Sequence, residues 1–172
     1  MKKSMRLLHV VFAFVFVALA LPIAHASAQA PRFGLGFEVL GSTADGLGIG
    51  LQGRASAPIN ADLSLGIDMG ATGFVLGGRR DATWVFDPQV AAIITLPSRS
   101  GRALYYLAGL GAYIPISDDE DNDAKAGPTV HGGIGWIQTL RETTFFYEIN
   151  PALVIAQDQV HLAVPLRVGI IF

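Results

Sequence analysis

Apolar side chains recur at every second position along most of the chain after residue 31, which is the spacing of β-strands. The last strand shows it best, because alternate positions from Val160 to Phe172 are all apolar. Six further segments share this period, and a seventh, 103–115, is apolar on both faces and cannot be oriented. Short turn-forming stretches separate the segments. The eight predicted strands are 32–41, 47–55, 63–72, 83–96, 103–115, 129–139, 144–155 and 160–172.

The two faces of these strands differ from those of a soluble sheet, which usually places charges outward. Here the apolar face carries no charge, and the other face mixes glycine with a few charges and amides. Only helices and closed barrels can satisfy their backbone groups in lipid, and barrel strands turn apolar side chains outward. The pattern therefore predicts an all-β fold: an eight-stranded antiparallel up-and-down transmembrane β-barrel.

Composition agrees with a membrane barrel and narrows the function classes. Of 172 residues, 51% are hydrophobic and 15% are charged, whereas about 25% charge is usual in soluble domains. The absence of cysteine excludes disulfides, thiolate metal sites and a lipid-anchoring cysteine. A formal net charge of −2 gives no reason to expect nucleic-acid binding.

The first thirty residues have the layout of a secretory signal peptide. A basic start precedes an apolar run over 7–21, which is short for a transmembrane helix. Small residues alternate after this run, and the sequence does not choose among cleavage sites after Ala26, Ala28 or Ala30. We therefore expect a signal peptide over 1–30 and a barrel domain over 31–172.

The inward face of the predicted barrel carries a set of polar side chains. These are Glu38, Arg54, Asp68, Asp87, Gln89, His131, Glu148, Asn150, His161 and Arg167. Buried charges must be paired or hydrated, and an eight-stranded barrel is just wide enough for side chains to fill it. The favoured interpretation is a polar network that fills the interior. The alternative is a narrow channel, since inward glycines leave space that Phe146, Tyr105 or Tyr113 would otherwise occupy.

An acidic stretch lies between the fifth and sixth predicted strands, over residues 117–128. Its carboxylates could bind Ca²⁺ or Mg²⁺, which prefer oxygen ligands, but the spacing is not that of an EF-hand loop. A solvated loop is the favoured interpretation, so no metal site is predicted. The weak candidate ligands are Asp118, Asp119, Asp121 and Asp123.

Catalysis is not expected. His131 and His161 are the only histidines after residue 30, and nucleophilic catalysis needs a nucleophile and a base within reach. Ser64 lies at an inward position of the alternating pattern, but nothing in the sequence places it beside a histidine. The glycine-rich stretches lie within strands and precede no helix, so they are not phosphate loops. No cofactor is expected.

The chain after the predicted signal peptide resembles a known family over its whole length. The most specific element of this resemblance is the final strand, VHLAVPLRVGIIF. The chain resembles the small eight-stranded outer-membrane β-barrels of bacteria, such as the OmpA membrane domain and its OmpX-like and OmpW-like relatives. The resemblance implies an outer-membrane location, termini in the periplasm, an extracellular acidic loop and contact with lipid and lipopolysaccharide. It also implies a monomer. The outer-membrane assembly machinery would recognise its last strand through Val164, Leu166, Val168, Ile170 and Phe172.

We therefore expect a non-enzymatic envelope role, in structural integrity, surface interaction or stress defence. The runner-up is a narrow channel or transporter for small or apolar solutes. A third possibility is a secreted soluble β-barrel that binds a hydrophobic ligand. On this face assignment, Leu166→Arg should block membrane assembly, whereas the neighbouring inward change Gly169→Ser should be far milder.

Overall fold

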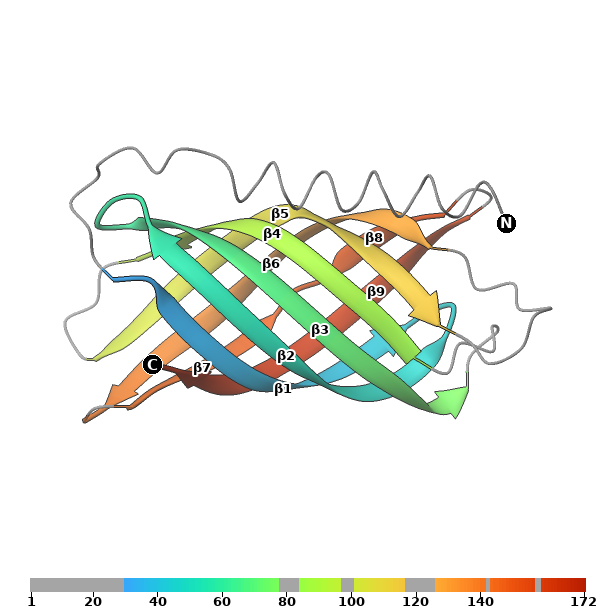
Figure 1. The fold of residues 1–172 in the computed structure, drawn as a ribbon, viewed down its shortest axis with the longest axis horizontal. Coiled ribbons are helices and arrows are strands. Elements are labelled where there is room, and N and C mark those ends of the chain that lie inside the picture. Colours follow the sequence, from blue (N-terminus) through green and yellow to red (C-terminus); the bar gives the residue numbers. More distant parts are fainter. Residues whose placement is uncertain (1–29, 78–83, 97–100, 117–125, 142, 157–158) are drawn as a thin grey trace.

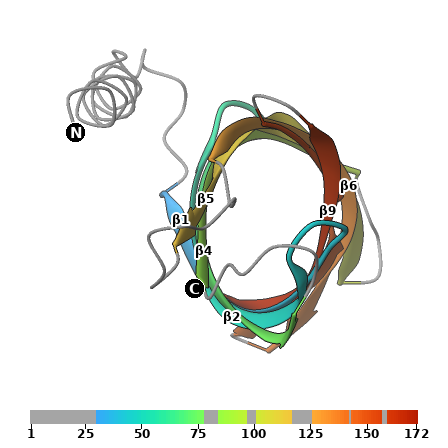
Figure 2. The same ribbon diagram turned by 90° about the vertical axis from the view of Figure 1, so that its right-hand side faces the viewer.

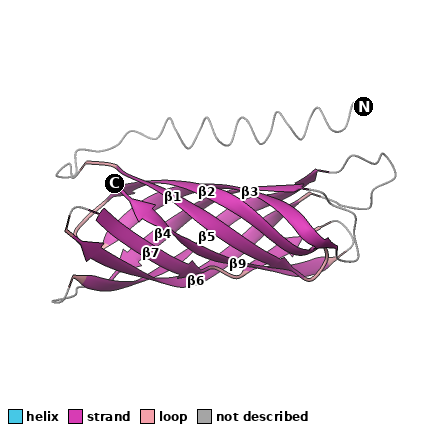
Figure 3. Ribbon diagram, turned by 90° about the horizontal axis from the view of Figure 1, so that it is seen from below, coloured by secondary structure: helices cyan, strands magenta, loops and turns pink. Residues whose placement is uncertain are grey.

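A computed structural model describes residues 30–77, 84–96, 101–116, 126–141, 143–156 and 159–172. The predicted signal peptide lies outside the described residues, except for Ala30, and so do Asp118, Asp119, Asp121 and Asp123 of the acidic stretch. Within the described residues, no helix is long and apolar enough to cross a membrane. The secondary structure drawn in Figure 3 consists of strands joined by turns.

The strands follow one another around the barrel in sequence order and tilt against its long axis (Figure 1). Their bounds are β1 Arg32–Ser42, β2 Gly46–Pro58, β3 Leu63–Gly77, β4 Trp84–Thr95, β5 Arg102–Ile116, β6 Gly127–Leu140, β7 Thr143–Ile149, β8 Ala152–Ile155 and β9 Val160–Ile171.

The segments β7 and β8 together form one barrel strand that is interrupted at Asn150 and Pro151. Both segments pair antiparallel with β6 on one side and with β9 on the other. Proline has no N–H group to donate to a ladder, which accounts for the break. The predicted strand over 144–155 therefore corresponds to these two segments, and the barrel has eight strands in all.

Pairing between β1 and β9 closes the sheet into a ring, which is visible end-on in Figure 2. In this seam Glu38 lies opposite Arg167, and Val39 lies opposite Leu166. The backbone groups of Phe33 and Phe172 exchange two hydrogen bonds, of 3.0 and 2.8 Å, near the start of β1. The predicted fold, an eight-stranded antiparallel barrel, is confirmed.

Several strands run longer than the alternating pattern predicts. β3 was expected over 63–72 but continues to Gly77, because β2 offers partners as far as Gly46. The register shifts between Leu47 and Gly48, so a bulge interrupts the alternation where the prediction ended. Backbone pairing with a neighbour, rather than side-chain alternation, sets the end of the strand.

We call the end of the barrel at Arg32 and Ile171 the terminal end, and the end at Ser42 and Gly46 the loop end. The outer face between them is apolar, with Leu35, Phe37 and Leu51 each about three-fifths exposed. Four large aromatic side chains also lie on this face, about half or more exposed: Trp84, Trp136, Tyr147 and Phe172. The structure also orients the ambiguous strand, since β5 turns Tyr106 and Leu110 outward and Tyr105 and Tyr113 inward.

Candidate functional site

The barrel interior gathers the polar side chains that the sequence places on the inward face. All of them are at most 7% exposed: Glu38, Arg54, Asp68, Asp87, Gln89, His131, Glu148, Asn150, His161 and Arg167. Charged side chains are rarely buried to this degree unless they are paired. The contacts among them therefore define the candidate site.

Arg167 on β9 is the centre of the larger ionic cluster. Its Nε lies 2.5 Å from Glu38 Oε2 on β1, which is the register partner across the closing seam. Its two terminal nitrogens lie 3.1 Å from Glu148 Oε1 on β7 and 3.1 Å from Asp87 Oδ2 on β4. Charge-assisted hydrogen bonds of this kind are stronger than neutral ones. One guanidinium thus joins three strands that are far apart in sequence.

Arg54 on β2 forms the second cluster. Its Nε lies 2.6 Å from Asp68 Oδ1 on β3. Its terminal nitrogens contact both oxygens of Glu148, at 2.8 and 3.1 Å, in a bidentate arrangement. The guanidinium carbon also lies 5.5 Å from the centre of the Phe146 ring, within cation–π range. Because Glu148 contacts both arginines, the two clusters form one network.

Uncharged side chains extend this network, and some of them were not singled out from the sequence. Tyr105 donates a hydrogen bond of 2.8 Å to Glu148 Oε2, and Thr72 donates one of 2.9 Å to Glu38 Oε1. Gln52 donates a short hydrogen bond to Asp68 Oδ1. Thr72 and Gln52 occupy inward positions of the same strand alternation as the ionic residues. That position was the only sequence signal for them.

A chain of amides links His131 to the ionic cluster. Asn150 Oδ1 lies 3.0 Å from His131 Nδ1, and Asn150 donates to Gln89 Oε1 at 3.1 Å. Gln89 in turn donates to Asp87 Oδ2 at 3.2 Å. His161 lies toward the loop end, where its ring packs edge-on against Tyr113 with centroids 5.3 Å apart. These contacts give both histidines packing or hydrogen-bonding roles.

The loop end of the interior is apolar and is capped by the turn between β1 and β2. Leu40, Val85, Tyr113, Val154 and Ala163 form one buried cluster. Asp45, in the turn, is completely buried and accepts hydrogen bonds from Tyr113 (2.7 Å) and Ser42 (3.2 Å). No sequence pattern indicates this contact, because a turn rich in small polar residues is typical of an exposed connection.

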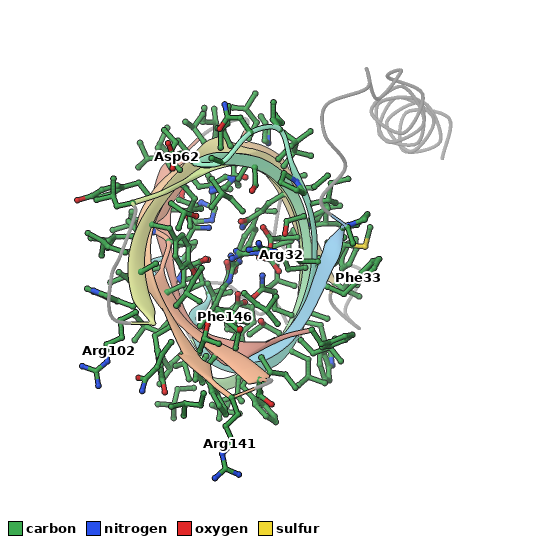
Figure 4. All side chains as sticks on the ribbon, turned by 90° about the vertical axis from the view of Figure 1, so that its left-hand side faces the viewer. Arg32, Phe33, Asp62, Arg102, Arg141 and Phe146 are labelled. Carbon is green, nitrogen blue, oxygen red and sulfur yellow. The ribbon has the colours of Figure 1, made fainter. Side chains whose placement is uncertain are left out.

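A second hydrophobic cluster lies toward the terminal end of the interior. Ala91, Ile93, Tyr105 and Leu107 form a buried cluster against which Ile137 packs. Figure 4 looks into this end and shows Phe146 inside the ring, whereas Phe33 lies outside and Arg102 and Arg141 point away.

A side chain added at the inward Gly169 would be crowded. A Cβ at Gly169 would lie 2.2 Å from the backbone oxygen of Leu35 and 2.5 Å from the ring of Phe146. The same ring would lie 2.9 Å from a Cβ at Gly36. These inward glycines make room for the phenylalanine, so they do not leave the space that a channel would use.

The residues expected to guide assembly lie on β9 or just beyond it. Leu166, Val168, Ile170 and Phe172 are between 39 and 67% exposed on the outer face, and Val164 is half-buried. Val164, Leu166 and Val168 face Gly41, Val39 and Phe37 of β1 in the closing seam, and Ile170 faces Leu35. The assembly role of this strand is still a prediction.

The closed ring, the apolar outer face and the ionic interior together define a small eight-stranded transmembrane β-barrel of the outer-membrane class. No protein-family model and no curated protein sequence matches the chain. Solved structures match in fold. The chain is similar to Neisserial surface protein A, with a TM-score of 0.69 and 14% identity over 85% of this chain and 98% of that one.

Two further solved barrels show the same architecture. The N-terminal β-barrel domain of Pseudomonas aeruginosa OprF matches with a TM-score of 0.58 and 17% identity, over 85% of this chain and 100% of that one. Yersinia pestis Ail, solved with the heparin analogue sucrose octasulfate, matches with a TM-score of 0.52 and 16% identity, over 83% and 97%. These likenesses show the barrel fold of this chain.

Proposed function

We propose that this protein is a sealed outer-membrane barrel with a non-enzymatic role in the cell envelope. The observation that carries the proposal is the occupied interior. A loop-end apolar cluster, a central ionic network and a terminal-end hydrophobic cluster follow one another along the axis. Their side chains leave little surface that a water molecule could reach.

The ionic network supports a structural role for the interior. Among the described residues, six ionic contacts made by two arginines join side chains from six strands: β1, β2, β3, β4, β7 and β9. Removing one partner from a buried pair is costly, because it leaves an uncompensated charge. Such a network favours one strand order and register. A rigid barrel of this kind suits envelope integrity or the display of its connecting loops to surface partners.

Conductance in planar bilayers tests the proposal. Folding of the purified protein is first established by a heat-dependent gel shift, and a channel-forming porin is measured in the same bilayers as a control. We expect inserted protein to give no discrete current steps. Regular steps from the folded, inserted protein would contradict a sealed barrel.

A narrow channel is the second candidate, and one observation favours it. Among the described residues, several buried polar side-chain atoms have no hydrogen-bond partner, including Asp68 Oδ2, Asp87 Oδ1 and Thr129 Oγ1. Such atoms usually contact water. If the barrel conducts, Asp87→Asn and Arg167→Gln should each change the size or the ion selectivity of the current steps.

A further inference from the structure

The central network carries more negative than positive groups. Its carboxylates are Glu38, Asp68, Asp87 and Glu148, and its guanidiniums are Arg54 and Arg167. All six side chains are at most 7% exposed. Burying a charge without compensation is expensive, so buried charges are paired or bind metal ions. The network therefore has a place for additional positive charge.

Unpartnered acceptor oxygens mark where that charge would lie. Among the buried side chains of the described residues, Gln52 Oε1, Asp68 Oδ2 and Asp87 Oδ1 have no hydrogen-bond partner. Gln52 is 2% exposed, Asp68 is 0% exposed and Asp87 is 5% exposed. All three atoms can accept a hydrogen bond or ligate a cation.

These three side chains lie on the adjacent strands β2, β3 and β4, at or beside the level of Gly70. Gly70 on β3 is the register partner of Gln52 on β2 and of Asp87 on β4. A Cβ at Gly70 would lie 2.0 Å from Asp87 Oδ1, so this oxygen lies directly over the glycine. Asp68 is on the same face of β3 two residues earlier, and its other oxygen accepts the hydrogen bond from Gln52. We call Gln52, Asp68, Gly70 and Asp87 the Gly70 cradle.

We propose that the Gly70 cradle binds a small monovalent cation such as sodium. Two carboxylate oxygens and one amide oxygen are ligands of the type that hard cations prefer. Each carboxylate is already paired with an arginine, Asp68 with Arg54 and Asp87 with Arg167, which suits a single positive charge. The described residues contain no group of three or more histidine, cysteine or acidic side chains that could hold a metal ion.

Refolding in different salts tests this proposal. The full barrel is refolded in chloride salts of lithium, sodium, potassium or choline at one ionic strength and pH, and the midpoint of the heat-dependent gel shift is measured. Because a ligand that binds only the folded state stabilises it, we expect one alkali cation to raise the midpoint by about 5 °C over choline in a saturable way. Equal midpoints in all four salts would overturn the proposal.

Further measurements distinguish a monovalent cation from other sources of positive charge. Stabilisation by calcium or magnesium alone, or by lower pH with no preference among the salts, would also overturn the proposal in favour of a divalent ion or a proton. Asp87→Asn and Gln52→Leu each remove a cradle oxygen, and either variant that folds should lose the cation dependence. Asp45→Asn changes a buried carboxylate outside the cradle and should keep it; loss in this control as well would contradict a local site.

Discussion

Leu166 and Arg167 are adjacent in β9, yet they occupy opposite environments. Leu166 is half exposed on the outer face, among apolar side chains only. Arg167 is 3% exposed and contacts carboxylates from three other strands. The outer face is uniform and needs only to be apolar, whereas the inner face depends on particular partners. On the outer face, the effect of a substitution should therefore depend on whether the new side chain is apolar. Inside the barrel, it should depend on whether the new side chain keeps the contacts of the old one.

The largest effect is expected inside, at Arg167. Arg167→Met keeps the length of the side chain but leaves Glu38, Asp87 and Glu148 without this partner. The free energy of unfolding should fall by about 3–5 kcal/mol, as measured by urea titration in lipid vesicles. Arg102→Met is the control, because Arg102 is exposed and points away from the barrel (Figure 4). Equal losses in both variants would contradict the central role of Arg167.

Leu166→Arg should be the next most damaging change, through the outer face. Leu166 lies near the middle of β9, and a charge at the bilayer midplane costs roughly 2–4 kcal/mol. Val160→Arg is the matched control, since Val160 begins the same strand at the loop end and is 65% exposed. There the same charge should cost only about 0–1 kcal/mol. The yield of folded barrel in vesicles measures both, and a similar yield would refute the assigned lipid face.

Replacing glycine with alanine should also have different effects on the inner and outer faces of the barrel. Gly169→Ala places a Cβ against the backbone of Leu35 and the ring of Phe146, and should cost about 1–3 kcal/mol. At Gly132, on the outer face, the nearest atom to an added Cβ is 3.7 Å away, in ordinary contact. Gly132→Ala should leave the urea midpoint unchanged or raise it. A larger loss at Gly132 than at Gly169 would reverse the comparison.

The smallest effect is expected at the cap of the loop end. Tyr113→Phe removes the 2.7 Å hydrogen bond to Asp45 and should lower the free energy of unfolding by about 1 kcal/mol. Tyr106→Phe, at a half-exposed position on the outer face of the same strand, is the control and should change it by less than about 0.5 kcal/mol. Urea titration of both variants decides whether the turn is held by this contact.

Residue periodicity was enough to predict which side chains face lipid. In β9 the alternation from Val160 to Phe172 assigns every residue to a face, because successive side chains of a strand point in opposite directions. The same rule placed Glu38, Arg54 and Glu148 inside. It failed to orient β5, since apolar residues on both faces carry no period, and it predicted the end of β3 too early.

The sequence by itself determined the class of the protein: eight strands, an apolar outer face and a polar interior, all consequences of a period of two. Only the tertiary structure decided which inward side chains meet. The pairing of Arg167 with Glu38, the burial of Asp45 and the crowding at Gly169 depend on the register between strands distant in sequence. Turn geometry fixes the register of strands that a hairpin joins, but β1 and β9 are paired only where the ring closes, with no turn between them.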